Sequence, residues 1–267
     1  DLANYSRAEL AYKELRLLGG SEGLAGTELD ERIAASVYRQ AEAAQASGDT
    51  DAAVQNYLRV AVAAPTAIIG ANAVYDAAAL LMSEQRWEQA IDVLDSFRGS
   101  YPQHAFGDEV TTKLALAYRE SGQSMKAARE FEQVASLDSV GAEVRREALW
   151  TAAILYEETS GLADARRVWK QFLGQYPDPF GEALEVRQKL ADLAGEMNDL
   201  GDRRAWLESV VSADAKAGSQ RTDRSKTLAA RAILEMAEGQ WLALSAVRLN
   251  APLAKNLKLK RSPMESA

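Results

Sequence analysis

The sequence predicts an all-α fold, a right-handed α-solenoid in which antiparallel helix pairs stack one after another. Two observations carry this prediction: a fixed repeat period, and a fixed pattern of small and bulky residues within each period. Four alanines spaced 37 to 38 residues apart anchor the repeats: Ala53, Ala90, Ala127 and Ala165. A period of this length is typical of stacked supersecondary units, each of which needs its neighbours to bury its apolar face.

Each anchor alanine stands at a fixed distance from other residues of defined type. Another small residue lies twelve positions earlier, at Ala41, Ala78, Ala115 and Ala153. A bulky apolar residue follows four positions later, at Tyr57, Leu94, Phe131 and Trp169. Proline follows twelve positions later at Pro65, Pro102 and Pro177, with Ser139 as the exception. Small residues let two helices approach closely, and proline ends the second helix.

Four well-formed repeats therefore occupy residues 30–177. Helical periodicity places their first helices at 30–46, 68–83, 107–121 and 143–159. The second helices are expected at 51–63, 88–100, 125–136 and 163–175. The turns between the two helices fall at Gly48-Asp49, Gln85-Arg86, Gly122-Gln123 and Ser160-Gly161.

The pattern weakens outside these repeats. Residues 1–29 are interpreted as a leading helix over 6–18, started by a capping box of Ser6 and Glu9, and a glycine-rich connector. Residues 178–250 indicate two degenerate helix pairs, expected at 182–198 with 202–214 and at 222–238 with 240–249.

The end of the sequence, residues 251–267, is interpreted as a basic loop followed by the start of a truncated helix. The loop carries Lys255, Lys258, Lys260 and Arg261. Ser262 and Pro263 are typical of the first residues of a helix, and the sequence stops at Ala267. Because the other end, Asp1, has neither an initiator Met nor a signal peptide, the chain is interpreted as a processed or excised piece.

Composition excludes several classes of function. Hydrophobic residues make up 47% and charged residues 26% of the 267, the range of a folded globular protein. A formal net charge of −8 disfavours nucleic acid as a partner, because phosphate binding needs a basic face. The absence of cysteine excludes disulfides, thiolate zinc sites and cysteine nucleophiles. No apolar run approaches the length of a transmembrane helix.

No residue pattern indicates a cofactor, a metal or catalysis. His104, the only histidine, follows Pro102 and has no second histidine with which to bind a metal. The glycine-rich stretch 19–26 lacks the Lys-Ser/Thr of a phosphate-binding loop. Asp49-Thr50-Asp51 has too few oxygen ligands for calcium and is interpreted as a turn and N-cap. A stand-alone enzyme is therefore disfavoured.

In a solenoid of this kind the first helices line the concave face. The positions offset from the small residues are the candidate partner-binding residues: Tyr38, Asn72, Tyr75, Met82, Glu109, Thr112, Leu116, Arg119, Glu147, Trp150, Ile154 and Glu157. One interpretation is that the aromatic side chains hold an extended or helical peptide while the carboxylates select basic ligands. The other is that the aromatic rings pack against the next first helix and the carboxylates form a solvated helix face.

The spacing of small, bulky and proline residues resembles the tetratricopeptide repeat (TPR), well over 30–177 and loosely over 182–250. The chain departs from that family in its 37- to 38-residue period, in having Ala where Gly is common, and at Ser139. The segments 97–102 and 172–177 both end in Tyr-Pro and resemble repeats of bacterial cell-envelope proteins. Those relatives are the lipoprotein partner of the β-barrel assembly machine and the coordinator protein of the Tol–Pal system.

The resemblance implies a non-catalytic scaffold that binds a protein or peptide, in a periplasmic or cell-envelope location and in contact with an envelope complex. A cytoplasmic location is the alternative. A second interpretation is an accessory region of a larger enzyme or membrane-linked machine. TPR domains that bind chaperone C-termini clamp a carboxylate with Lys, Asn and Arg, and the matching positions here are Tyr38, Glu42, Asp76, Glu109 and Lys113. The resemblance therefore disfavours a co-chaperone role.

Overall fold

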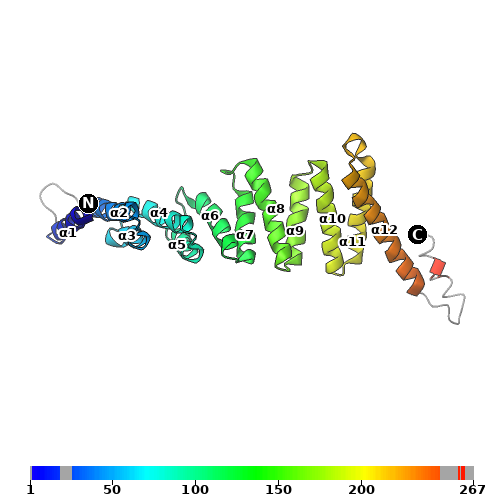
Figure 1. The fold of residues 1–267 in the computed structure, drawn as a ribbon, viewed down its shortest axis with the longest axis horizontal. Helices are drawn as coiled ribbons and strands as arrows, with labels where there is room; N and C mark the ends of the chain where they lie inside the picture. The colour runs from blue at the N-terminus through cyan, green and yellow to red at the C-terminus, as the bar shows by residue number, and fades with distance from the viewer. Residues whose placement is uncertain (1, 19–25, 247–257, 259, 262–267) are drawn as a thin grey trace. The chain divides into compact units, whose positions relative to one another are not determined.

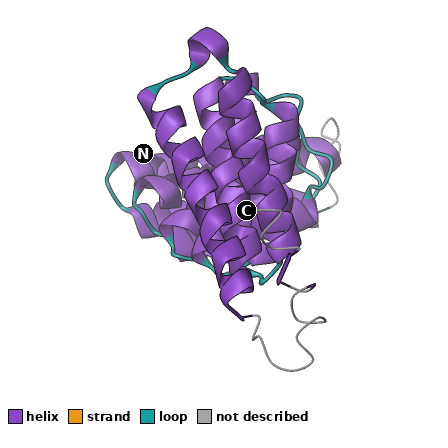
Figure 2. Cartoon of the chain, turned by 90° about the vertical axis from the view of Figure 1, so that its right-hand side faces the viewer, coloured by secondary structure: helices purple, strands orange, loops and turns teal. Residues whose placement is uncertain are grey.

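The computed structural model describes residues 2–18, 26–246, 258, 260 and 261. No strand occurs among these residues, and short loops join successive helices (Figures 1 and 2). The helices are α1 (Leu2–Leu17), α2 (Gly26–Ala46), α3 (Thr50–Ala63), α4 (Ile69–Ser83), α5 (Trp87–Ser100), α6 (Gly107–Glu120), α7 (Ser124–Ser136), α8 (Ala142–Glu158), α9 (Leu162–Gln175), α10 (Phe180–Glu196), α11 (Leu200–Lys216) and α12 (Asp223–Ala246). The predicted all-α fold is confirmed.

The helices belong to two compact units, which we describe separately. Unit 1 spans residues 1–148 and unit 2 spans residues 149–267, so that the boundary falls within α8. Repeats 1, 2 and 3 of unit 1 are the pairs α2–α3, α4–α5 and α6–α7. Unit 2 contains the rest of α8 with α9, the pair α10–α11, and α12.

A turn of one conformation connects the first helix of every pair to the second. One residue in each turn has a left-handed backbone, with φ between +57° and +81°: Gly48, Gln85, Gly122, Ser160 and Asn198. The following residue donates its N–H to the carbonyl five positions earlier, as in the 3.0 Å bond from Asp49 to Ala44. This bond caps the C-terminus of the first helix. Four turns lie where the sequence predicts them, and Asn198 marks a fifth.

The repeat alanines lie at the centre of the packing within each pair. All eight, which are Ala41, Ala53, Ala78, Ala90, Ala115, Ala127, Ala153 and Ala165, are fully buried. The bulky residues four positions after the anchors are buried at Tyr57, Leu94 and Trp169, and Phe131 is half-buried. Burial of one such side chain stabilises the fold by about 1.5–3 kcal/mol. The eight small positions are therefore buried as the repeat pattern predicts, together with three of the four bulky ones.

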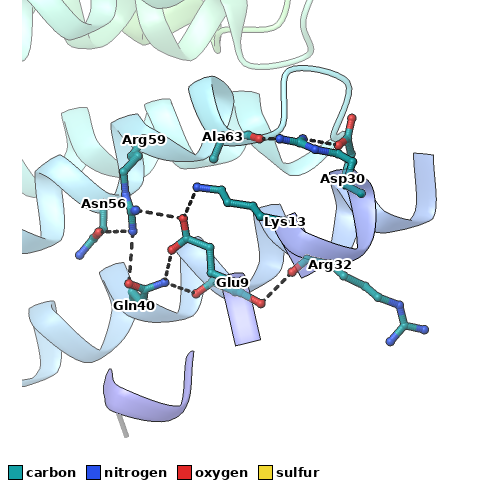
Figure 3. A network of polar contacts seen from close by, with 10 residues as sticks. Glu9, Lys13, Asp30, Arg32, Gln40, Asn56, Arg59 and Ala63 are labelled. Atoms are coloured by element: carbon teal, nitrogen blue, oxygen red, sulfur yellow. Dashed lines mark hydrogen bonds and ion pairs between the residues drawn. The ribbon is translucent and has the colours of Figure 1, made fainter. Parts of the chain in front are cut away.

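Helix α1 packs on repeat 1 through a buried carboxylate (Figure 3). Glu9 is 4% exposed and accepts hydrogen bonds from Lys13 at 2.6 Å, Gln40 at 2.8 Å and Arg59 at 3.0 Å. The predicted capping box of Ser6 and Glu9 is wrong, because α1 begins at Leu2 and Ser6 lies inside it. Gln40 on α2 and Arg59 on α3 donate hydrogen bonds to the Glu9 carboxylate. Glu9 therefore makes a tertiary contact and does not cap a helix.

The second half of the chain departs from its predicted helix pairs at one point. Residues 182–198 and 202–214 correspond to α10 and α11, whose core contains Leu184, Leu207 and Val210. The predicted break between 238 and 240 is wrong, because α12 continues through Gly239. A glycine within a helix costs only about 1 kcal/mol, which the good helix-forming residues on both sides offset.

Several predictions concern the ends of the described ranges. Helix α2 starts at Gly26, four residues earlier than expected, while residues 19–25 of the predicted connector lie outside the described residues. The predicted helix start at Ser262 lies outside them too. Lys258, Lys260 and Arg261 are helical, so the predicted basic loop is wrong at those three positions. No proline or glycine interrupts the sequence there.

Candidate functional site

Two tyrosines of unit 1 join neighbouring first helices. The Tyr38 hydroxyl, on α2, donates a hydrogen bond to Asp76 on α4. The Tyr75 hydroxyl, also on α4, donates to Glu109 on α6 over 2.5 Å. Both phenols occupy the position three residues before the small residue of their helix, so one sequence position performs the same task in consecutive repeats. We call the surface formed by α2, α4 and α6 around these residues the first-helix face.

The tyrosine rings pack against neighbouring aromatic rings. The Tyr38 ring meets Tyr57 edge-on at 5.2 Å between centroids, and the Tyr75 ring lies 4.6 Å from Phe106. Both tyrosines are half-buried. Burial raises the pKa of Tyr75, and the adjacent Glu109 carboxylate raises it further because it disfavours a second negative charge. The rings are therefore fixed supports rather than freely exposed anchors.

A pocket of 360 Å³ opens beside Tyr75 on this face. Its lining comes from α4, the loop before α6, α6 itself and the loop after α7: Tyr75, Ala105, Asp108, Glu109, Thr112, Lys113, Ser139 and Val140. All of these residues belong to unit 1. A volume near the lower end of about 300–1,000 Å³ suits one or two side chains of a partner better than a large cofactor.

Each of the two carboxylates in the pocket accepts a hydrogen bond from a side chain of another element. Asp108 accepts a hydrogen bond from the Ser139 hydroxyl, and Glu109 accepts one from Tyr75. Each carboxylate is held through one oxygen, Oδ2 of Asp108 and Oε2 of Glu109. The Lys113 ammonium lies 5.2 Å from the centroid of the Tyr75 ring. The ring therefore has a cation over it, a favourable arrangement.

An aromatic loop packs against the Tyr75 ring. Phe106 lies 4.8 Å from the His104 ring, and His104 lies 5.5 Å from Phe97. The Phe106 backbone N–H donates to Nδ1 of His104 over 3.2 Å, so His104 organises this loop. Phe97 and Tyr101 lie 5.2 Å apart at an interplanar angle of 47°.

The second Tyr-Pro segment, in unit 2, repeats this ring geometry. Phe172 and Tyr176 also lie 5.2 Å apart at 47°. The predicted binding residue Trp150 packs edge-on against Trp169 at 4.7 Å and against Phe172 at 5.2 Å. The aromatic position of this repeat thus contributes to a ring cluster.

The other predicted residues of unit 2 lie near the same cluster. Glu157 accepts the indole N–H of Trp169 and forms an ion pair with Lys189 at 3.0 Å. Ile154 is half-buried. Glu157 thus links α8, α9 and α10 and is more than a solvated carboxylate.

The remaining predicted residues lie in unit 1 at varied exposure. Asn72, Thr112, Arg119 and Glu147 are exposed, Leu116 is 36% exposed and Met82 is half-buried. The pocket brings together Tyr75, Glu109 and Thr112 of the predicted set. It adds Ala105, Asp108, Lys113, Ser139 and Val140, which sequence reasoning did not select as binding residues. Asp108 stands next to a selected position, and Ser139 replaces the repeat proline, which is the signal that marks it.

No other chemistry emerges from the described part of the chain. No cluster of three or more His, Asp or Glu side chains there is arranged to hold a metal ion. None of the helices in the described ranges combines the length and apolar character that a bilayer crossing requires. The geometry is that of a repeat scaffold with a polar pocket on one face.

Comparisons with known proteins agree with a helical-repeat protein. The family model of the tetratricopeptide repeat matches residues 73–104, which contain most of α4, all of α5 and the loop to His104. The search of curated proteins gives no match.

Several solved structures are similar to this chain at low sequence identity. MamA shares 14% identity over 70% of this chain and 94% of its own, with a TM-score of 0.41. YrrB, titled a TPR protein with an unusual peptide-binding site, shares 12% over 70% and 89%, also with 0.41. A structure of Naa15/Naa10 bound to HypK-THB matches 99% of this chain and 39% of its own, at 15% identity and a TM-score of 0.52. The fold is a TPR-like α-solenoid.

Proposed function

We propose that this protein is a non-catalytic scaffold that binds a segment of a partner protein on the first-helix face of unit 1. The observation that carries the proposal is the 360 Å³ pocket between α4 and α6. One of its lining residues, Tyr75, lies in the stretch that matches the tetratricopeptide repeat, and the pocket contains three of the residues predicted to bind a partner. A TPR-like solenoid presents such surfaces to protein or peptide partners.

The lining of the pocket suits recognition of a peptide side chain. Tyr75 provides a ring that Phe106 and the Glu109 carboxylate hold in one orientation. Rigid aromatic groups give contact area at low entropic cost, and fixed polar groups give specificity. The neighbouring exposed residues Asn72 and Thr112 offer additional polar contacts along the same face.

The test fills the pocket without disturbing its supports. Ala105 is exposed and lines the pocket, so Ala105→Trp places an indole where the partner would bind. Ala163→Trp is the matched control, because Ala163 is exposed on α9 in unit 2. Peptides selected from a displayed library on the unmodified protein serve as probes, and their affinities are measured by fluorescence anisotropy.

We expect Ala105→Trp to weaken the selected peptides at least about tenfold, the loss of roughly 1.4 kcal/mol, and Ala163→Trp to leave them unchanged. Equal affinities for both variants would place binding elsewhere and refute the proposal. A library that yields no specific peptide would count against it as well.

We further propose that the scaffold acts in a bacterial cell-envelope assembly. Support comes from the two Tyr-Pro segments, which resemble repeats of envelope proteins and have the same ring geometry. Fractionation of cells that carry the tagged full-length protein tests this location. Recovery in the periplasmic or membrane fraction is expected, and recovery with cytoplasmic markers would refute it.

A further inference from the structure

We infer that the pocket beside Tyr75 receives the side chain of an arginine or lysine from the partner segment. This inference rests on the proposed function and specifies its ligand. It depends on the apolar and carboxylate groups that line the pocket, on the capacity of the carboxylates to accept further hydrogen bonds, and on the net charge of the lining.

The lining matches a side chain with an apolar stem and a cationic head. Ala105, Val140 and the Tyr75 ring provide apolar surface, while Asp108 and Glu109 provide carboxylates. Lysine and arginine bury their methylene groups along apolar surface and keep the charged group among polar partners. A purely apolar side chain would leave both carboxylates without a partner of opposite charge.

The two carboxylates retain capacity to accept hydrogen bonds. The Ser139 hydroxyl binds Oδ2 of Asp108 and the Tyr75 hydroxyl binds Oε2 of Glu109. Among the described contacts, the second oxygen of each carboxylate has no hydrogen-bond donor. A guanidinium or ammonium group would supply donors to these oxygens, and such charge-assisted hydrogen bonds are the strong ones.

The charge balance of the site favours a cation. Lys113 is the only cation among the lining residues, so it offsets one of the two negative charges. It lies over the Tyr75 ring and forms no ion pair with Asp108 or Glu109 among the described contacts. Asp76, the acceptor of the Tyr38 hydroxyl, adds a negative charge on the same face. An anionic ligand would therefore meet like charges at close range.

Four synthetic peptides test the inference. They share one flexible neutral sequence and differ only at the central residue, which is arginine, lysine, norleucine or glutamate. Norleucine retains the apolar stem without the charge. Binding is followed by NMR chemical shifts of the backbone amides of residues 105–113 in the full chain, at low and at high salt.

We expect the arginine and lysine peptides to bind at least about tenfold more tightly than the norleucine peptide, because each adds a charge-assisted hydrogen bond. The glutamate peptide should bind most weakly. High salt should reduce the preference for the two basic peptides. A tighter arginine than lysine complex would indicate that both carboxylates bind one planar guanidinium.

A double variant provides the residue-level test. Asp108→Asn with Glu109→Gln removes the two charges but keeps an oxygen acceptor for Ser139 and Tyr75. The matched control, Glu88→Gln with Asp92→Asn, removes two charges from exposed positions on α5. The pocket variant should lose the preference for basic peptides while its norleucine affinity and melting temperature change little, and the control should keep it.

The outcomes separate the inference from the function on which it rests. Equal binding of norleucine and basic peptides at the pocket, or tighter binding of glutamate, would overturn the inference and leave the scaffold proposal intact. If no peptide shifts a pocket resonance and Ala105→Trp leaves the library-selected peptides unaffected, both proposals fail. A preference for basic peptides that both double variants lose equally would also overturn the inference, because net charge would then explain it.

Discussion

Tyr75 shows how one residue serves both the fold and the site. Its ring packs on Phe106 and Phe97, and its hydroxyl reaches across to Glu109 of the next repeat. Of the two interpretations that the sequence left open, the ring contacts support a packing residue, and a binding role for Tyr75 stays a prediction. The body of the residue supports the pocket, and the hydroxyl positions one of the pocket carboxylates.

Substitutions of Tyr75 should separate these two parts. Tyr75→Phe keeps the ring contacts and removes one hydrogen bond, so we expect the free energy of unfolding to fall by about 1 kcal/mol. Tyr75→Ala also removes the ring and should cost about 3 kcal/mol or more. Urea unfolding monitored by circular dichroism measures both. Equal losses for the two variants would show that the ring packing contributes nothing.

Glu9 links the stability of the N-terminal region to pH. Burial alone would raise the pKa of Glu9, but hydrogen bonds from Lys13 and Gln40 and the charge of Arg59 outweigh it and lower the pKa. A carboxyl group with a lowered pKa contributes stability above its unfolded value of 4.5. That contribution is lost as pH falls below 4.5 through the folded-state pKa.

We therefore expect hydrogen exchange in α1 to become faster, relative to α4, as pH falls below 4.5. Glu9→Gln removes the titrating group and should flatten this dependence while it weakens the contact of α1 with repeat 1 at neutral pH. Glu14→Gln is the control, because Glu14 is exposed on the same helix. An unchanged pH dependence in Glu9→Gln would refute the assignment.

At the scale of elements, the turn that the helix pairs share predicts where glycine should stabilise the fold. The left-handed positions hold glycine in two turns but Gln85 and Ser160 in two others. A side chain in this conformation costs free energy that glycine avoids. Gln85→Gly and Ser160→Gly should each raise the free energy of unfolding by about 1 kcal/mol.

The same substitution should have the opposite sign inside a helix. Gln89→Gly, at an exposed position of α5, should lower the free energy of unfolding by about 1 kcal/mol. Thermal and urea unfolding of the three variants measure the difference. Destabilisation by all three would show that the turns gain nothing from glycine.

The elements also show which features the sequence can predict. The repeat alanines, the helix pairs and four of the five turns follow from local spacing, because each pair closes through contacts close in sequence. The start of α1 and the role of Glu9 depend on side chains of α2 and α3, up to 50 residues away. The contact of Ser139 with Asp108, across 31 residues, depends on the loop after α7, for which the repeat pattern specifies no geometry.

At the scale of whole units, apolar exposure is concentrated on α12 of unit 2. Four large apolar residues there are more than half exposed: Ile233, Leu234, Trp241 and Leu242. The other half of the helix is packed, since Leu228 and Ala232 belong to the unit 2 core. Exposed apolar surface binds hydrophobic dyes.

The double substitution Leu234→Glu with Trp241→Gln should reduce dye fluorescence strongly. It should change the free energy of unfolding by no more than about 0.5 kcal/mol, because both side chains are exposed. Leu228→Glu is the contrasting change, since Leu228 is 3% exposed and its substitution should destabilise unit 2. Unchanged dye binding in the double variant would show that these residues are covered in solution.

The pocket draws all of its lining from residues 75–140, a stretch that runs from within α4 to the loop after α7 and belongs to two neighbouring helix pairs. The pocket is therefore encoded by one continuous piece of sequence. Duplication of those two pairs would copy the pocket, and exchange of them between related solenoids would transfer it. Substitutions that alter the remaining pairs would leave it intact. In such a molecule, one surface can change by substitution within a single segment while the other helix pairs are inherited unchanged.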